Sequence, residues 1–352
     1  MKEIDRILKE AFEKGASDII ICAGSKPAYR VTGSLVQSGF GIMEKNDCKT
    51  LLYSILTDDQ IRQFEKELDI DLSYESENIS RYRVNIHMQM ESIAAAFRPI
   101  PVKIPSIAEL KLPQIVADLA SEKRGLILVT GPTGHGKTTT QASMIDVINS
   151  TRKSHVITVE DPIEYLHKSK LSIIEQREIG IDTSSFNSAL KHVLRQNPDV
   201  ILIGEMRDIE SVATAITAAE TGHLVISTLH TGNTIQAIDR IIDVFPPYQQ
   251  QQIRTQLSLS LAGIVAQQLI PTSDGSGLIV AVEIMIATSG IRNLIRKGNS
   301  AELYSMIEIG AKYGMISMDS SIADLYKRKI ISHENAILHA INPENLEKIL
   351  TK

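Results

Sequence analysis

Short apolar stretches alternate with amphipathic ones along the first hundred residues. Apolar side chains at Ile4, Ile7, Leu8 and Phe12 recur at helical spacing, and Gly15 follows them as a helix stop. The segments "DIIICAG" and "AYRVTGSLV" are typical of short strands, and "NDCKTLLYSILTDDQIRQFEKE" has a helical pattern. The segments "ISRYRVNIHMQ" and "SIAAAFRPI" indicate an antiparallel strand pair. Together these patterns predict an α+β domain.

A proline-rich segment then interrupts the pattern. The stretch "RPIPVKIPS" cannot form a regular helix or a central strand, because proline lacks a backbone N–H and has a fixed φ. We therefore expect a first domain over residues 1–98, a linker over 99–108 and a second domain over 109–352.

Strands and helices alternate in the second domain. The continuous apolar runs "GLILVTG" and "DVILIGE", with "HVITVEDP" and "LVISTLHT", predict strands, and helical patterns such as "DIESVATAITAAETGH" lie between them. This alternation predicts an α/β domain with a parallel sheet. From about Pro246 onward the pattern predicts mostly helix, and "LSLSLAGIVAQQLI", residues 257–270, is expected to be a buried helix.

Composition narrows the class of protein. The 352 residues are 43% hydrophobic and 22% charged, with a net charge of -5, which disfavours a main role in binding duplex DNA. Cys22 and Cys48 lie far apart, so we expect neither a disulfide framework nor a zinc site. The charged N-terminal stretch does not match a signal peptide, and no run approaches the ~20 apolar residues of a membrane span. We expect a cytoplasmic protein without direct membrane insertion.

The segment "GPTGHGKT", Gly131–Thr138, matches the phosphate-binding pattern GxxxxGK[ST] and lies between a predicted strand and a predicted helix. Gly134 and Gly136 allow backbone N–H groups to turn toward a phosphate, Lys137 can reach the β- and γ-phosphates, and the Thr138 hydroxyl can bind Mg²⁺. We expect His135 to contribute its backbone while its ring faces solvent. The sequence thus predicts a site for ATP and Mg²⁺. The expected nucleotide contacts are Gly131, Pro132, Thr133, Gly134, His135, Gly136, Lys137, Thr138 and Thr139.

Carboxylates follow two predicted strands. Glu205 ends the run "DVILIGE", in the place of a Walker-B acid beside the nucleotide strand, where it can position Mg²⁺ or the attacking water. The segment "TVEDPIEY" places Asp161 and Glu164 after another strand, where they can bind Mg²⁺ or act on water. Taken alone, that segment is equally typical of a capped turn.

Histidines and arginines supply further candidates. His223 and His230 bracket the run "LVISTLH", which makes them candidate γ-phosphate sensors, although single histidines are usually structural. Arg83 and Arg98 lie on the strand pair of the first domain. They can reach a nucleotide only where two domains or subunits meet, so an exposed strand arginine is the default interpretation.

The motifs "GPTGHGKTTT", "TVEDPIEY", "IGEMRD" and "GHLVISTLHT", in this order, give the chain a strong resemblance to the secretion ATPases that power type IV pili and type II secretion. The segments "RYRVN", "AAAFRPI" and "GIRNLIRKG" extend this resemblance to the PilT-type pilus retraction ATPases. It implies a PAS-like N-terminal domain and a RecA-like P-loop ATPase domain with a helical C-terminal portion. It also implies a homo-hexamer at the inner face of the cytoplasmic membrane, with an inner-membrane pilus platform protein as partner.

The resemblance also implies roles for single residues. Glu164 and Glu205 would organise or activate water, His223 and His230 match the His-box stretch, and Arg83 and Arg98 would reach the triphosphate. The last of these reverses the default interpretation of the arginines. Which glutamate acts as the general base stays open.

Two alternatives to a retraction motor remain. A pilus or secretion assembly ATPase would use the same chemistry, but it usually has a longer N-terminal region and often a four-cysteine zinc module, and this sequence has neither. A nucleic-acid translocase is disfavoured by the acidic balance, the absence of tryptophan and an aromatic content of 4%.

Overall fold

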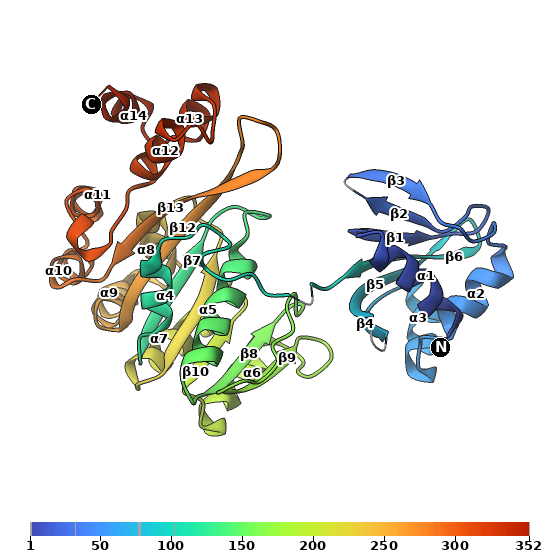
Figure 1. Ribbon diagram of the computed structural model, residues 1–352. Helices are drawn as coiled ribbons and strands as arrows, with labels where there is room; N and C mark the ends of the chain where they lie inside the picture. The colour runs from blue at the N-terminus through green and yellow to red at the C-terminus, as the bar shows by residue number, and fades with distance from the viewer. Residues whose placement is uncertain (1, 32, 77–78, 102, 352) are drawn as a thin grey trace. The chain divides into compact units, whose positions relative to one another are not determined.

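The computed structural model describes residues 2–31, 33–76, 79–101 and 103–351, which form two compact units (Figure 1). The first contains the residues up to Lys103 together with Glu164–Leu166, and the second contains Ile104–Ile163 and His167–Lys352. Apart from that short segment, the units divide between Lys103 and Ile104.

The first unit is an α+β domain built on an antiparallel sheet with strand order β3-β2-β1-β6-β5-β4. Its core is built around the buried rings of Tyr29, Phe64, Tyr82 and Phe97. This agrees with the expected fold class. The strands are β1 (Asp18–Ile21), β2 (Ala28–Val31), β3 (Ser34–Gln37), β4 (Asp69–Ser76), β5 (Ser80–Gln89) and β6 (Ser92–Pro99), and the helices are α1 (Glu3–Glu13), α2 (Lys45–Tyr53) and α3 (Asp58–Glu67).

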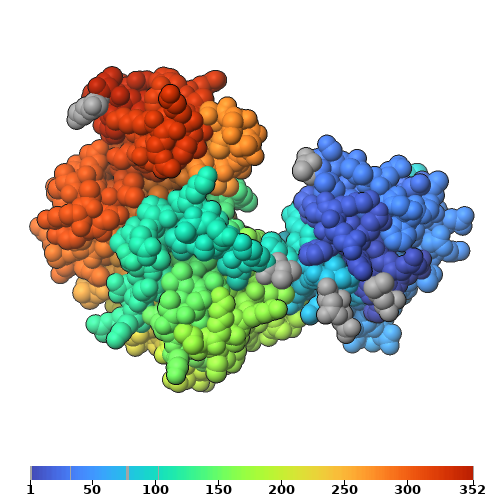
Figure 2. Space-filling view, viewed as in Figure 1, coloured from blue at the N-terminus to red at the C-terminus, as the bar shows by residue number. Residues whose placement is uncertain are grey.

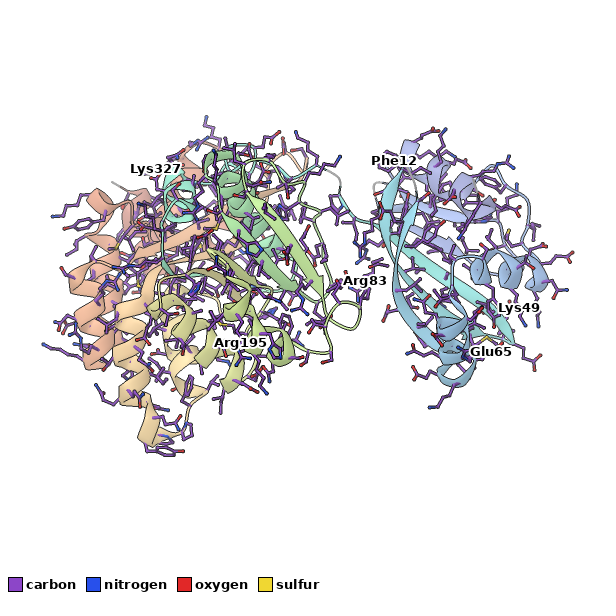
Figure 3. The ribbon with its side chains drawn as sticks, turned by 90° about the horizontal axis from the view of Figure 1, so that it is seen from below. Phe12, Lys49, Glu65, Arg83, Arg195 and Lys327 are labelled. Atoms are coloured by element: carbon purple, nitrogen blue, oxygen red, sulfur yellow. The ribbon has the colours of Figure 1, made fainter. Side chains whose placement is uncertain are left out.

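Local details of this unit differ from the sequence prediction. Ala11 of α1 is buried, whereas Phe12 is 47% exposed and projects from the helix (Figure 3). The single helix expected after residue 45 is two helices, because Thr57 caps α3: its hydroxyl accepts from Gln60 N (3.3 Å), and the Gln60 side chain accepts from Thr57 N (2.9 Å).

The second unit is an α/β domain whose sheet has the order β13-β12-β7-β11-β10-β8-β9, parallel except for the edge strand β13. Strands β7, β10 and β11 are buried along their whole length, as a sheet with both faces covered requires. The strands are β7 (Gly125–Thr130), β8 (His155–Glu160), β9 (Ile173–Glu178), β10 (Val200–Ile203), β11 (Leu224–Leu229), β12 (Leu261–Pro271) and β13 (Leu278–Ile286). The helices up to β12 are α4 (Gln114–Ala120), α5 (Lys137–Thr151), α6 (Phe186–Val193), η1 (Leu194–Gln196), α7 (Ile209–Glu220), α8 (Thr234–Asp243) and α9 (Pro247–Ser260).

The expectation of a buried helix over residues 257–270 was wrong. Helix α9 ends at Ser260, and the chain continues as β12, which pairs with β7 on one side and β13 on the other. Both faces of β12 are covered, so its apolar residues form a continuous run, and such a run cannot be told from a buried helix by periodicity alone. Gly263 permits the close strand contact, since a Cβ there would lie 3.0 Å from the Met285 carbonyl oxygen.

The chain beyond β13 is helical, as expected. In the space-filling view these C-terminal residues (red) lie against the residues of β13 (orange) (Figure 2). None of the helices in the described part of the chain is long and apolar enough to cross a membrane. The helices are α10 (Ser289–Lys297), α11 (Ser300–Glu308), η2 (Ala311–Tyr313), α12 (Met318–Lys327), α13 (His333–His339) and α14 (Pro343–Leu350).

Candidate active site

The glycine-rich loop connects β7 to α5, as the motif predicted. Gly131 has a φ of +149°, and a Cβ there would lie 2.4 Å from the carbonyl oxygen of Gln267 on β12. Gly134 and Gly136 are left-handed, with φ values of +81° and +80°. Only glycine adopts this set of conformations without strain, and a side chain at Gly131 would collide with β12. The loop therefore requires glycine at these positions.

Lys137 begins α5 and lies under this loop. Its side chain is 8% exposed, and Nζ donates to the carbonyl oxygens of Gly131 (2.9 Å) and Pro132 (3.0 Å). A buried ammonium group at a helix N-terminus favours an anion beside it. Gly134 leaves open space where a Cβ would stand. These features fit the phosphates of a nucleotide, and Thr138 in the first helical turn offers the hydroxyl that a phosphate-bound Mg²⁺ takes.

The ring of His135 does not simply face solvent. Its Nδ1 accepts a hydrogen bond from the backbone N–H of Leu269 on β12 (3.0 Å). Burial, and then the positive charge of nearby His339 and Lys137, lower the pKa of His135 below its usual value. The neutral ring therefore attaches the loop to β12, which corrects the expectation of a spectator.

The strand arrangement corrects one sequence expectation. Strand β10, which leads to Glu205, is not the neighbour of β7, because β11 lies between them. The loop after β11 is tied to β7: Thr130 Oγ1 donates to the Thr231 carbonyl (2.6 Å) and accepts from Thr231 N (3.2 Å). The carboxyl ends of these parallel strands meet at one edge of the sheet, so residues after β11 lie between the phosphate loop and Glu205.

Glu205, His230 and Thr133 form a connected cluster at this edge. The Glu205 carboxylate is 15% exposed; Arg207 Nε lies 2.7 Å from Oε1 and His230 Nε2 lies 3.2 Å from Oε2. His230 Nδ1 is 3.4 Å from Thr133 Oγ1 in the phosphate loop. Since a carboxylate only accepts, Nε2 carries the proton, and the Nδ1 of a neutral ring accepts from Thr133. His230 therefore links the loop to the strand-end carboxylate.

The acids after β8 have different environments. Glu160 is 7% exposed and accepts from Thr158 Oγ1 (2.6 Å) and Gln176 Nε2 (3.2 Å). Asp161 and Glu164 are exposed, and Glu164 belongs to the short segment Glu164–Leu166, which is grouped with the first unit. Glu178 of β9, which the sequence reasoning missed, accepts from Ile163 N (3.2 Å) and holds this loop.

His223 does not join the cluster around Glu205. It precedes β11 at the amino end of the sheet, where Nδ1 lies 2.9 Å from the Ala218 carbonyl and 3.2 Å from Thr221 Oγ1. Strand β11 separates it from His230 by roughly 20 Å, at about 3.3 Å per residue. Within one chain, His223 supports the turn after α7.

Arg83 and Arg98 stand opposite each other on β5 and β6 of the first unit. Both side chains are exposed, and Arg83 projects from its strand (Figure 3). Arg98 is anchored, because its Nε and Nη2 lie 2.9 and 2.7 Å from Asp18 Oδ1. The structure thus presents two neighbouring positive charges on one face of this sheet.

A cavity of about 400 Å³ lies beside the start of α5. Its lining combines apolar side chains of β12 and β13, including Leu269 and Ile279, with Thr139 and Thr140 of α5. A mostly apolar cavity next to a phosphate loop offers room for a nucleotide base.

Comparison with known proteins identifies the family of this chain. The family model described as "Type II/IV secretion system protein" matches residues 104–306. The chain is 43% identical to the type IV pilus retraction ATPase PilT of Pseudomonas aeruginosa over 343 residues, which cover 97% of this chain and 99% of that protein. It is also 43% identical to a twitching motility protein of Neisseria gonorrhoeae, covering 91% of this chain and 86% of that protein.

Solved structures give the same result. A crystal structure of the pilus retraction motor PilT with bound ADP has a TM-score of 0.93 and 45% identity, with 99% of each chain covered. The ATPase DotB of Legionella pneumophila has a TM-score of 0.82 and 27% identity, covering 95% of this chain and 94% of that one. The chain therefore belongs to the type II/IV secretion ATPase family, within its PilT group of pilus retraction ATPases.

Proposed function

We propose that this chain is the ATP-hydrolysing subunit of a motor that retracts type IV pili. The main support is that the side chain of His230 links the phosphate loop to the strand-end carboxylate. Its Nδ1 lies 3.4 Å from Thr133 Oγ1, and its Nε2 lies 3.2 Å from Glu205 Oε2. That connection occurs in a chain that resembles PilT over nearly its whole length.

The residues of the cluster divide the chemistry between them. Lys137 exchanges the Gly131 and Pro132 carbonyls for phosphate oxygens and stabilises the negative charge that grows during phosphoryl transfer. Glu205 accepts a proton from the attacking water, and Arg207 and His230 hold its carboxylate in place. Thr138, with Asp161 as a further ligand, would hold Mg²⁺, which neutralises phosphate charge when bound. Glu205 is the alternative Mg²⁺ ligand if Glu164 acts on the water.

His230 is suited to report the state of the nucleotide. Its ring contacts both the phosphate loop and Glu205, so a shift of Thr133 on phosphate loss changes the support of the carboxylate. Glu164 remains a second candidate for activating water, and His223 a candidate for a role outside its own chain.

We further propose that the motor is a homo-hexamer in which Arg83 and Arg98 of one domain bring positive charge to the bound triphosphate. Support comes from their exposed, adjacent positions, with Arg98 oriented by Asp18. Binding of ATP would draw the arginines in and loss of the γ-phosphate would release them, which converts hydrolysis into movement of one rigid unit against another. The ring would act at the cytoplasmic face of the membrane on a pilus platform protein.

Co-expression of two inactive variants tests shared sites. Lys137→Ala removes the phosphate contact, and an Arg83→Ala/Arg98→Ala variant removes the donated charge. If each site draws on two subunits, mixed rings regain about a quarter of the wild-type turnover, because that share of interfaces has an intact loop and intact arginines. Normal turnover of the arginine variant alone would contradict their role, and a fully active monomer would contradict the ring.

A further inference from the structure

We propose that Gln267 of β12 is a positioning residue that holds the phosphate loop in its nucleotide-binding form. The inference rests on the proposed ATPase function and adds a residue from outside the glycine-rich motif. Gln267 is 1% exposed. Its neighbour Ala266 pairs with Thr130, the last residue of β7. Gln267 therefore lies beside the point where β7 ends and the phosphate loop begins.

Gln267 contacts the loop at its beginning, its tip and the helix that follows. Its backbone carbonyl fills the space where a Cβ of Gly131 would stand. Its side-chain Nε2 donates to the carbonyl of His135 at the tip (2.5 Å), and its Oε1 accepts from Thr140 Oγ1 on α5 (2.9 Å). The loop is therefore tied to β12 through Gln267, which also lines the cavity beside the start of α5.

The carboxamide group is suited to this arrangement because it offers a donor and an acceptor at once. A carboxylate would keep the bond from Thr140 but could not donate to His135. A leucine would leave the Thr140 hydroxyl without its acceptor. Because Thr140 is only 2% exposed, water cannot easily replace the lost hydrogen bond, and the unpaired hydroxyl would be destabilising. The bond from Leu269 N to the His135 ring adds a second tie between β12 and the tip.

This arrangement predicts that losing the carboxamide weakens nucleotide binding more than it slows chemistry. The free loop would sample conformations in which its N–H groups no longer converge. Nucleotide binding would then have to order the loop, and the free energy of that ordering would weaken the affinity. The proton transfer at Glu205 involves none of these bonds, so kcat should change little.

The test compares Gln267→Leu with Gln268→Met. Gln268 lies next on β12, but its side chain contacts His339 of α13. We expect Gln267→Leu to raise the Kd for ADP and the KM for ATP about 10- to 100-fold, with kcat within about 3-fold of wild type. Gln268→Met should stay within about 2-fold on all three. Both full-length variants are assayed as purified protein, with thermal unfolding as the check on folding.

A double-mutant cycle with Thr140→Val separates positioning from general packing. If the Oε1 bond orders the loop, the effects of Thr140→Val and Gln267→Leu on ADP affinity are not additive, and the double variant binds about as weakly as Gln267→Leu. Wild-type ADP affinity in Gln267→Leu, or fully additive effects in the cycle, would overturn the proposal. Failure of wild-type protein to bind or hydrolyse ATP would instead refute the proposed function. If Gln267→Leu does not fold, Thr140→Val alone decides, since it should raise the Kd for ADP at least about 3-fold.

Discussion

The clearest catalytic prediction concerns Glu205→Gln. The substitution removes the proton-accepting carboxylate but preserves size and most of the local hydrogen bonding. The amide oxygen can still accept from Arg207 Nε, now 2.7 Å from Oε1. The amide N–H₂ can face His230, whose ring then changes tautomer, so that Nε2 accepts and Nδ1 donates to Thr133.

The chemistry of a general base sets the expected magnitudes. A general base contributes about 10²–10⁴-fold to rate, so kcat should fall at least about 100-fold, equivalent to about 2.7 kcal/mol in the barrier. Nucleotide binding depends on the loop and Lys137. Replacing the charged hydrogen bonds of Glu205 by the neutral ones of glutamine should change the free energy of ADP binding by about 1 kcal/mol. The Kd for ADP should therefore change by less than about 10-fold.

Steady-state phosphate release and equilibrium ADP binding measure the two effects separately. Glu210→Gln is the matched control, because Glu210 is an exposed acid only a few residues further along and pairs with Lys191 at 3.3 Å on the surface. It should change kcat by less than about 2-fold. If Glu205→Gln retains kcat within about 5-fold of wild type while folded, the assignment of Glu205 as the base is wrong, and Glu164 becomes the better candidate.

Three further predictions follow from single residues. Lys137→Ala should abolish detectable ATP turnover and weaken ADP binding, measured by phosphate release and calorimetry; turnover above about a tenth of wild type would refute its role at the phosphates. Gly131→Ala should lose nucleotide binding or fail to fold, because its Cβ would lie 2.4 Å from the Gln267 carbonyl; normal ADP affinity in a folded variant would contradict the described loop. Burial lowers the pKa of His167 from 6.5 to about 4. The negative charge of Asp146 opposes this shift, and the positive charge of Lys170 adds to it. The neutral ring thus contributes stability that is complete above pH 6.5 and is lost as the pH falls toward 4, up to about 3 kcal/mol. Denaturant unfolding of His167→Phe should show a smaller loss of stability over that range than wild type, and parallel pH profiles would refute the assignment.

The phosphate site was predictable because its signal is local. The glycine spacing, Lys137 and the flanking strand and helix all lie within one short stretch, and the structure has them in that order. Glu205 and His230 were also singled out from the sequence, since each follows a buried strand, and the structure brings their side chains within 3.2 Å of each other. The order of strands was not predictable from periodicity, so β11 between β7 and β10 came only from the structure.

The contribution of β12 was missed for a physical reason. Its residues are apolar on both faces, a pattern shared by buried helices, so the strand that supports the loop was assigned as a helix. The two adjacent glutamines within "IVAQQLI" were the available signal, because a polar residue in an otherwise apolar run needs a partner. His135 was misjudged similarly: its partner, Leu269 N, is distant in sequence.

The central claim is that ATP hydrolysis by this chain removes pili from the cell surface. Counting surface pili by electron microscopy tests it directly, in cells that lack the gene and in the same cells supplied with wild-type or Lys137→Ala protein. We predict excess pili in the deletion strain, normal numbers with wild-type protein and continued excess with Lys137→Ala. Bald cells after deletion would contradict retraction and indicate an assembly motor, and normal numbers with Lys137→Ala would show that hydrolysis at this loop is not what drives the process.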